Sequence, residues 1–505
     1  MTEQYDRDED LIQEQTQGAL SRSVSLVGAR VSTWVLAFIM TVIMPRYLGA
    51  DGFGRFYTAL SLTGVMSILV EFGLDSLVAR EVARRKEEAG RYLLGAGIIK
   101  VVLWVVASII LGIVVRVIGY PAETQIATLI LAISVLFTAI ATLLIAILQA
   151  NDRMRWIAVS TMLEKIIYVV FGVAVLVMGK GVIAIAVVTL VSLVAATVLD
   201  FWWFSRLSEG NSLRLGSKSV DVKELFIRAL PFFSVLFFGA IYFRLDVVFL
   251  SLLASEKAVG IYGAAYRLFQ TTYILPEAFL FSFFPLFSRL SPSKGGGLEV
   301  AAQKSFDILM LIGLPLAAGT CVLSRELIGT LYGAKEYADS IMIMQVLAVA
   351  IALMYANGVF VQLLIATDRQ KRLAVTAGVA AALNVASNLV LISVFGALGA
   401  AMATVLTELL VIVMNFSFLP PELRRRLRFG ATVRIALSAA AMAGVLLLSK
   451  GLAKTLIPGV PGFFVLLALV VAGIATYFAA VLVLRAVPAD DWAMIRSAIK
   501  NLRTS

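Results

Sequence analysis

Fourteen long apolar segments constrain this chain more than any other feature of its sequence. A helix rises 1.5 Å per residue, so about 20 apolar residues cross the ~30 Å hydrocarbon layer of a membrane. The chain is 60% hydrophobic and 15% charged, whereas soluble domains are about half apolar and a quarter charged. We therefore predict an all-α integral membrane protein with fourteen transmembrane helices. The segments are 24–44, 54–78, 92–118, 125–149, 156–178, 181–204, 228–253, 262–285, 304–323, 341–366, 372–394, 396–419, 431–449 and 462–484.

The distribution of lysine and arginine orients these helices. Loops after even-numbered helices, such as AREVARRKEEAGR (79–91) and ELRRRLRF (422–429), are richer in both residues than loops after odd-numbered helices. Positively charged loops stay in the cytoplasm. We therefore expect a multi-pass protein of the cell (cytoplasmic) membrane with both termini cytoplasmic. This asymmetry and attraction to anionic membrane lipids explain the net charge of +11 without a nucleic-acid partner.

Several classes of function are excluded by what the sequence lacks. The chain has no His and a single Cys, Cys321, so it can form neither an internal disulfide nor a His/Cys metal cluster. It has no phosphate-binding Gly-rich loop followed by Lys and Ser or Thr. The longest loop, 205–227, is too short for an extramembrane catalytic element. We expect no enzymatic activity, no cofactor and no metal.

The segments outside the helices complete the predicted domain organisation. The first 17 residues are polar and acidic, unlike the basic start of a signal peptide, so we expect residues 1–22 to be a disordered cytoplasmic tail. In 490–505, Trp492, Ile495 and Ile499 share one helical face, as in a helix that lies on a membrane surface.

The chain also contains an internal repeat. ANDRMRWIAV (150–159) and ATDRQKRLAV (366–375) share their Ala, Asp, Arg, Ala and Val positions at an offset of 216 residues. Each precedes the fifth helix of a six-helix set, so the two sets run in the same sense. Two such parallel bundles imply a cleft between them, through which a transporter can alternate access. The predicted domains are a first lobe 23–204, a cytoplasmic linker 205–227, a second lobe 228–419, two further helices within 431–484 and the tail 490–505.

Two longer motifs carry a resemblance to a known family. MPRYLGADGFGRFYTALSLTGVMSILVEFGLDSLVAREVARR (44–85) resembles the N-terminal signature of Wzx-type polysaccharide flippases, and LYGAKEYADS (331–340) is similar to their second-half motif. These flippases belong to the MATE-like (MOP) exporter superfamily. The resemblance implies two six-helix lobes around a central cavity, as in the related lipid II flippases, with two C-terminal helices outside.

The resemblance also implies a function and partners. Polyprenyl-diphosphate-linked oligosaccharide would move from the cytoplasmic to the outer leaflet, and glycan polymerase or ligase proteins would be further partners. In the related lipid II flippases, cationic residues of the cavity engage the diphosphate of the lipid.

Three embedded arginines are candidate substrate ligands: Arg30, Arg244 and Arg267. An ionisable residue at mid-bilayer costs at least ~2.5–3.5 kcal/mol, so each needs a partner or a wet cavity. A guanidinium group binds phosphate oxygens through a planar fork. Arg244 and Asp246 are two residues apart on one helix, so their side chains diverge and do not readily pair. Either residue could instead pair with another helix.

Further embedded polar residues have two interpretations. Asp246, Tyr242 and Tyr266 are candidate substrate contacts, the tyrosines through stacking on sugar rings. Glu71, Asp75 and Glu277 either couple transport to H⁺ or Na⁺ or serve as salt-bridge partners and gates. For the other embedded charges we expect pairing between helices. These are Lys100, Glu164, Lys165 and Glu408.

Three other functions compete with a glycan flippase. A small-molecule or drug exporter of the same superfamily would need an acidic or aromatic pocket without three arginines. A membrane enzyme of glycan assembly is disfavoured by the short loops. A scaffold that transports nothing is disfavoured by the duplicated lobes.

Overall fold

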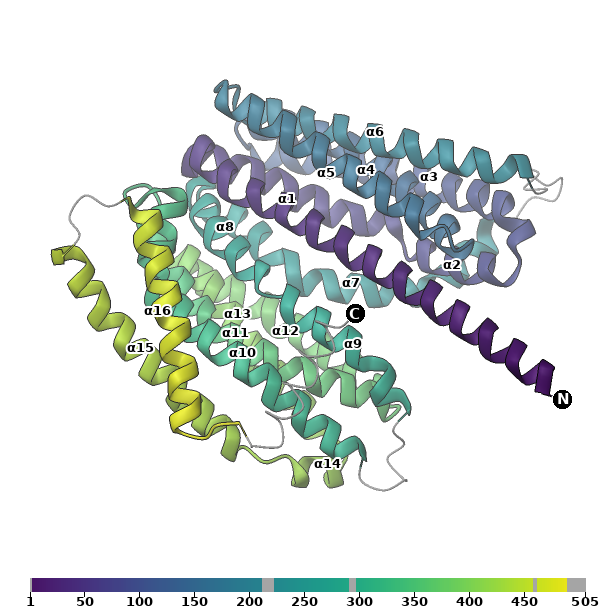
Figure 1. Cartoon of the computed structure of the whole chain (residues 1–505). Coiled ribbons are helices and arrows are strands. Elements are labelled where there is room, and N and C mark those ends of the chain that lie inside the picture. The colour runs from purple at the N-terminus through teal and green to yellow at the C-terminus, as the bar shows by residue number, and fades with distance from the viewer. Residues whose placement is uncertain (1, 211–221, 290–296, 457–460, 488–505) are drawn as a thin grey trace. The chain divides into compact units, whose positions relative to one another are not determined.

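The computed structural model of the chain is built from helices (Figure 1). It describes residues 2–210, 222–289, 297–456 and 461–487. Within these ranges, the side chains of residues 2–31, 207–210, 234–236, 238–244, 281–286, 288–289 and 452–456 are not described. The described ranges contain no strand, which confirms the predicted all-α class.

Unit 1 is a compact body of Met1–Leu48 and Arg55–Ala240. One hydrophobic core cluster of unit 1 lies where α2, α3 and α4 meet the first half of α7. Helix α2 buries Leu74, Leu77, Val78 and Val82, which recur at the spacing of one helical face. The helices are α1 (Thr2–Glu71), α2 (Leu74–Arg84), α3 (Ala89–Ile118), α4 (Ala122–Ala150), α5 (Met154–Val177), α6 (Gly181–Gly210) and α7 (Val222–Leu253), with a 3₁₀ turn at Lys86–Glu88.

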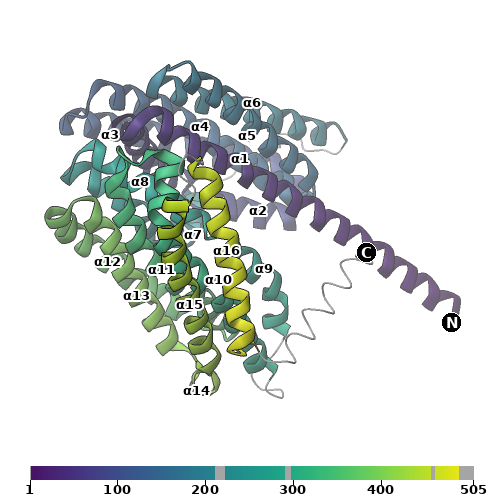
Figure 2. The same cartoon turned by 60° about the vertical axis from the view of Figure 1, so that its left-hand side comes forward.

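Unit 2 consists of Gly49–Gly54 and Ile241–Ser505. Within it α11 packs against α10 and α13, and α15 packs against α10 and α16. Figure 2 shows α15 and α16 running beside each other. Its helices after α7 are α8 (Glu256–Thr271), α9 (Ile274–Arg289), α10 (Gly297–Ile328), α11 (Ala338–Ala366), α12 (Gln370–Phe395), α13 (Ala397–Phe418), α14 (Pro421–Arg426), α15 (Gly430–Leu456) and α16 (Gly462–Val483), with a π-helical turn at Gly329–Gly333.

Eleven helices of the described residues are long and apolar enough to span a membrane. The first of these, Ser32–Arg84, is 53 residues long and contains two of the predicted segments, 24–44 only in part. The predicted segments 228–253 and 262–285 are not among the eleven. A multi-pass membrane protein is therefore confirmed, while the count of fourteen stays a prediction.

The units divide the chain differently from the predicted lobes 23–204 and 228–419. The first half of α7 packs within unit 1, and Gly49–Gly54 of α1 packs within unit 2. Residues 2–22, expected to be a disordered tail, continue helix α1; their Glu, Gln and Leu residues are good helix formers. Most of the predicted linker (211–221) and the predicted surface helix 490–505 lie outside the described residues.

The two copies of the repeat have the same backbone turn. Asp152 and Asp368 are both left-handed, with φ of 59° and 57°. In each copy the following arginine donates its backbone N–H to a carbonyl five residues earlier, Arg153 to Leu148 at 3.0 Å and Arg369 to Leu364 at 2.8 Å. This 6→1 bond ends a helix with a left-handed residue, a position that Asp tolerates better than most. The sequence repeat is thus also a conformational repeat.

Helix α1 is interrupted at Gly49, whose backbone (φ 69°, ψ 174°) is not helical. The interruption takes the Ala50 N–H out of the helical ladder, and Glu336 Oε1 accepts it at 2.7 Å. The carboxylate thus acts as the N-cap of the resumed helix. Glu336 belongs to LYGAKEYADS and Ala50 to the N-terminal motif, so the two family motifs contact each other within unit 2.

The helical backbone is also interrupted between α8 and α9, just before Pro276. Proline has no N–H, so it cannot bond the carbonyl four residues earlier, which belongs to Thr272. Tyr355 of α11 donates its hydroxyl to that oxygen at 2.9 Å. A buried tyrosine thus completes the hydrogen bond that Pro276 removes.

A close backbone crossing in unit 2 leads to the first prediction. A Cβ on Gly260 of α8 would lie 1.9 Å from the carbonyl oxygen of Ala50, and one on Gly54 would lie 1.8 Å from that of Glu256. We expect Gly260→Ala to lower the free energy of unfolding by about 1–3 kcal/mol or more, because backbone atoms cannot move aside as side chains do. Thermal unfolding of the detergent-purified protein measures this.

The matched control is Gly97→Ala in α3, where an added Cβ meets no atom within 4 Å. Alanine at an open helical position is expected to stabilise by about 0.5–1 kcal/mol. Equal melting temperatures for Gly260→Ala and the wild type would contradict the crossing.

Candidate functional site

The predicted substrate contacts lie on three helices, α1, α7 and α8. Arg30 is in α1 and Tyr242 and Arg244 are in α7, and their side chains lie outside those that the structure describes. Arg267 lies in α8 and is half-buried. Its Cζ is 5.8 Å from the ring centroid of the fully buried Phe53, so its guanidinium packs on an aromatic face of the N-terminal motif, a cation–π geometry.

Asp246, predicted beside Arg244, is 2% exposed inside unit 2. Its Oδ2 accepts the hydroxyl of Tyr262 from α8, and its Oδ1 accepts the N–H of Val247 at 2.8 Å. The Tyr262 hydroxyl also lies 3.5 Å from Thr404 Oγ1 of α13. Asp246 therefore connects α7 to α8 and, through Tyr262, to α13. Its predicted contact with substrate stays a prediction.

Tyr266 is likewise buried, one helical turn after Tyr262. The two rings stack at a centroid distance of 5.1 Å, and Tyr266 also contacts Phe269 at 5.7 Å. In this structure Tyr266 thus packs against protein aromatics and holds Tyr262 in place. Stacking on a sugar would require it to become exposed.

A second buried carboxylate lies in the same part of unit 2. Glu408 of α13 is 2% exposed and accepts the hydroxyl of Tyr273 at 3.4 Å. Glu408 lies one helical turn after Thr404 on α13, the helix that Tyr262 reaches. We call Asp246, Tyr262, Thr404, Tyr273 and Glu408 the unit 2 polar cluster.

Amide side chains lie on the neighbouring helix α12. Asn384 donates to Thr407 Oγ1 at 3.4 Å, and Asn388 donates to Asn384 Oδ1 at 3.0 Å. Such oxygen atoms suit a proton or a small hard cation. Among the described residues, no three His, Cys, Asp or Glu side chains are arranged to hold a metal ion.

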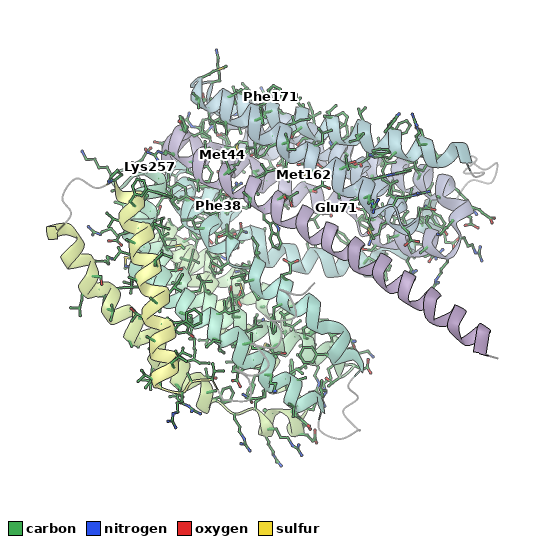
Figure 3. The ribbon with its side chains drawn as sticks, viewed as in Figure 1. Phe38, Met44, Glu71, Met162, Phe171 and Lys257 are labelled. Carbon is green, nitrogen blue, oxygen red and sulfur yellow. The ribbon has the colours of Figure 1, made fainter. Side chains whose placement is uncertain are left out.

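Two of the three predicted coupling acids have defined contacts in unit 1. Glu71, the last residue of α1 (Figure 3), accepts the hydroxyl of Ser67 at 3.1 Å. Asp75 forms an ion pair with Lys100 of α3 at 2.5 Å. Glu277, in the first turn of α9 in unit 2, is exposed. Asp75 therefore pairs with a lysine of its own unit.

The side chain of Lys100 is only 1% exposed, yet its ammonium group has a full set of hydrogen-bond acceptors. Besides Asp75, its ammonium donates to the Ala139 carbonyl at 2.9 Å and to Thr142 Oγ1 at 3.2 Å. These three acceptors match the three donors of an ammonium group. The expectation that Lys100 pairs between helices is confirmed. Lys165, in contrast, pairs with its chain neighbour Glu164 at 2.8 Å.

One cluster on α2 and α7 was missed by sequence reasoning. Phe72 and Gly73 are left-handed, with φ of 45° and 70°, and they separate α1 from α2. The Phe72 ring stacks on Phe226 and on Phe233 of α7 at 4.4 Å each. A Cβ on Gly73 would lie 2.5 Å from the Cβ of Phe232. The dipeptide FG inside the apolar run was the only available signal, and it did not reveal its partner.

Charged residues add to the contact between α2 and α7. Arg228 of α7 pairs with Glu81 of α2 at 2.8 Å. Arg80 also pairs with Glu81, at 2.9 Å, and its Cζ lies 5.3 Å from the Phe232 ring centroid. The start of α7 is thus fixed to α2 by rings and by charges.

With this geometry in hand, comparison with known proteins identifies the family. The model of a family described as "Polysaccharide biosynthesis protein" matches residues 20–291. The chain belongs to this family. Its resemblance to Wzx-type flippases is thereby confirmed.

One curated relative is similar over most of the chain. The "Probable low-salt glycan biosynthesis flippase Agl15" of Haloferax volcanii is 26% identical over 429 residues, which cover 84% of this chain and 88% of the relative.

Solved structures share the fold of this family member. A lipid II flippase, MurJ, in an inward closed conformation superposes with a TM-score of 0.71 at 16% identity, covering 92% of this chain and 99% of the other. An inward-facing multidrug resistance MATE transporter of the MOP superfamily gives 0.64 at 16% identity, covering 78% and 94%. The predicted MATE-like and MurJ-like fold is therefore confirmed.

The pair Asp75–Lys100 leads to the second prediction. Asp75→Asn leaves an uncompensated ammonium in a buried site, which is expected to cost about 3–5 kcal/mol of stability. Replacing both residues, as Asp75→Leu with Lys100→Met, should recover most of this loss, because no charge then remains buried. Thermal unfolding of the purified variants measures both effects.

Glu123→Gln is the matched control, because the Arg55–Glu123 pair is exposed at 34% and 48%. Exposed ion pairs contribute about 0–1 kcal/mol. A double variant no more stable than Asp75→Asn would contradict charge burial as the cause.

Proposed function

We propose that this protein is a flippase that moves polyprenyl-diphosphate-linked oligosaccharide from the cytoplasmic to the outer leaflet by alternating access. The observation that carries the proposal is the similarity of 84% of the chain to a probable glycan biosynthesis flippase. Membership of a polysaccharide biosynthesis family supports it, and so does the fold shared with a lipid II flippase. Both termini would lie in the cytoplasm, on the side of the basic loops.

The chemistry of the cargo supports a role for the embedded arginines. A diphosphate is the charged part of such a lipid, and guanidinium groups bind phosphate through two parallel hydrogen bonds. We propose Arg30, Arg244 and Arg267 as the groups that bind it. Arg267 already lies on the face of Phe53 at 5.8 Å, a contact that orients a guanidinium plane.

A drug exporter is the second candidate. The MATE transporters share the fold, but a likeness at 16% identity does not extend to the substrate. A glycan-assembly enzyme gains no support, since the relatives named above are flippases and transporters. Glycan polymerases or ligases would act on the flipped lipid as partners.

Coupling to H⁺ or Na⁺ would act through the unit 2 polar cluster. Asp246 and Glu408 are the two buried carboxylates that bond to tyrosine hydroxyls there. Buried carboxylates hold protons or cations more readily than exposed ones do. This assigns coupling to different acids from Glu71, Asp75 and Glu277, the first of which bonds to Ser67 and the second to Lys100.

The third prediction concerns Arg244. In a flippase-deficient host, Arg244→Ala is expected to abolish most export of surface glycan, because the diphosphate loses its ligand. Arg244→Lys should keep part of it, since it keeps the charge without the bidentate fork. Surface glycan is quantified at matched protein abundance in the membrane.

Arg116→Ala, at the last turn of α3, is the control and should export normally. Full export by Arg244→Ala would overturn the phosphate-binding assignment.

The fourth prediction concerns coupling. Purified protein in proteoliposomes is given a lipid-linked oligosaccharide, with and without a Na⁺ or H⁺ gradient. Asp246→Asn is expected to keep basal flipping and lose the stimulation by the gradient, because an amide accepts the Tyr262 hydroxyl but carries no exchangeable charge.

Glu277→Gln is the informative control, because that side chain is exposed. It should remain fully stimulated. Loss of stimulation in Glu277→Gln, together with normal stimulation in Asp246→Asn, would return coupling to the acids proposed from the sequence.

A further inference from the structure

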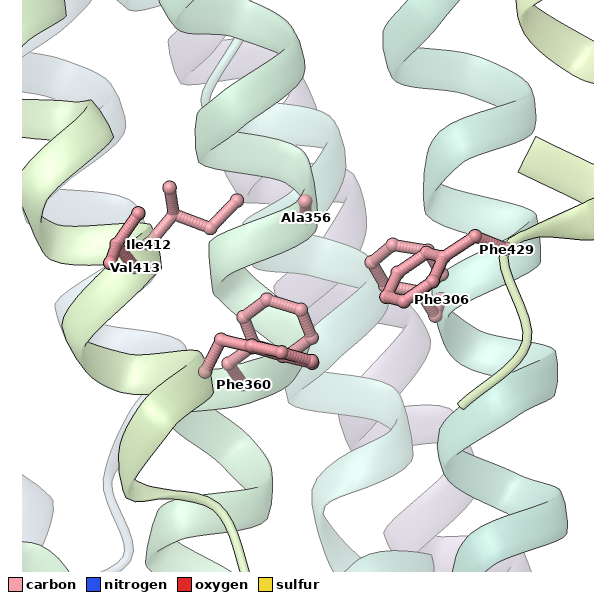
Figure 4. A pocket seen from close by; sticks show the side chains of 7 residues that line it. Phe306, Ala356, Phe360, Ile412, Val413 and Phe429 are labelled. Carbon is pink, nitrogen blue, oxygen red and sulfur yellow. The ribbon is translucent and has the colours of Figure 1, made fainter. Parts of the chain in front are cut away.

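An apolar groove opens on the surface of unit 2 between α10, α11, α13 and the residue before α15 (Figure 4). Its volume is about 230 Å³. All its lining residues are apolar, and three helices and one connecting segment supply them. We call it the phenylalanine groove; its lining residues are Phe306, Ala356, Phe360, Ile412, Val413, Phe416 and Phe429.

The rings of the groove hold one another in place. Phe306 stacks on Phe360 at a centroid distance of 5.7 Å and meets Phe429 edge-on at 5.6 Å. Phe416 contacts Phe360 at 5.4 Å and Phe429 at 6.1 Å. Four phenyl rings in contact form a rigid wall. The groove is therefore formed before any ligand enters it.

The groove opens outward. Val413 and Phe429 are 58% and 44% exposed, although both side chains are apolar. A surface of this kind in a membrane protein faces hydrocarbon and not water. Its natural occupant is an apolar chain.

Positive charge borders the groove where the chain passes from α13 to α15. Phe429 follows directly on Arg428, and Phe416 precedes Ser417, whose carbonyl oxygen accepts Arg424 at 3.3 Å. Arg369, the residue before α12, and Arg372 of α12 both donate to the neighbouring carbonyl of Phe418, at 2.8 and 3.1 Å. We call these residues the basic rim: Arg369, Arg372, Arg424, Arg425, Arg426 and Arg428.

Two guanidinium groups of the basic rim are available to a ligand. Arg426 pairs with Glu299 at 3.5 Å. Arg425 and Arg428 are exposed, and no carboxylate among the described residues forms an ion pair with either. The Arg428 backbone is held on both sides by Gln303, which accepts its N–H at 2.7 Å and donates to its carbonyl at 2.9 Å. The loop thus presents positive charge from a fixed position.

We propose that the phenylalanine groove and the basic rim form a binding site for one anionic phospholipid of the surrounding membrane. A hydrocarbon chain of the lipid lies in the groove, and Arg425 and Arg428 bind its phosphate. Juxtamembrane arginines attract anionic headgroups in this way. By contacting Phe429 and Phe416 together, the lipid fastens the start of α15 to α13.

Charge decides between this occupant and two others. In a twofold-symmetric dimer through this groove, a second copy of the chain would bring an identical basic rim against the first one. The chain's own segment 488–505 carries Arg496, Lys500 and Arg503 against Asp490 and Asp491, so its side chains offer the rim no net negative charge. A lipid phosphate is negative and attracts the rim. The site takes a membrane lipid and does not depend on the proposed transport of glycan lipid.

Native mass spectrometry of the delipidated full-length protein tests the site. Phosphatidylglycerol and phosphatidylcholine are added in separate titrations. The wild type is expected to retain phosphatidylglycerol on the order of tenfold more tightly. Arg425→Gln with Arg428→Gln should lose this preference, because the headgroup attraction is electrostatic.

Val413→Phe is the second variant. It narrows the groove from a half-exposed position and should weaken the binding of both lipids, while the fold, read from thermal unfolding, is unchanged. The charge-matched control is Arg84→Gln with Arg155→Gln, two exposed arginines of unit 1, and it should keep the preference.

Four results would overturn the proposal. They are equal retention of the two lipids by the wild type, unchanged retention by Val413→Phe, a wild-type dimer that Val413→Phe dissociates, and lipid binding that appears only after deletion of residues 488–505.

Discussion

A backbone group that leaves the helical ladder inside a packed protein must find another hydrogen-bond partner, and this constraint shapes two helix breaks of the structure. A buried N–H or carbonyl without a partner costs about 1–3 kcal/mol. Gly49 frees the Ala50 N–H, and Glu336 accepts it. Pro276 frees the Thr272 carbonyl, and Tyr355 donates to it. Each break is thus tied to a side chain from a distant part of the sequence, so a local irregularity becomes a tertiary contact.

The same constraint governs the embedded charges. Lys100 is inside unit 1 because three acceptors surround its ammonium. Asp246 is inside unit 2 because Tyr262 and a backbone N–H donate to its carboxylate. A charge satisfied in this way contributes to the fold first, and it contributes to transport only if its bonds can exchange for bonds to a proton, an ion or a substrate.

The internal repeat of the sequence accounts for one recurring turn of the structure. The same left-handed aspartate ends a helix in both copies of the A-x-D-R motif, so the duplicated sequence encodes a duplicated turn. The two copies have since diverged in detail. In the first, Arg153 lies on the Trp156 ring at 4.9 Å; in the second, Arg369 and Arg372 bond to the Phe418 carbonyl beside the phenylalanine groove. A flippase and a lipid-binding surface can therefore share one repeated framework.

The sequence by itself determined the helical class, the membrane location and the family, because hydropathy, length and two motifs are properties of neighbouring residues. It also predicted the pairing of Lys100, since a buried lysine must find acceptors. It did not predict that Asp75 would be the partner, that Tyr262 would bond to Asp246, or that the ring of Phe72 would lie between two rings of α7. These partners are separated by 16 to more than 150 residues, and only packing brings them together. Tertiary structure likewise decided that Gly49–Gly54 packs with unit 2. It also decided that four phenylalanines, from α10, α11, α13 and the residue before α15, form one groove. Contact between distant segments depends on shape and not on local pattern, which is the reason that only the tertiary structure could show it.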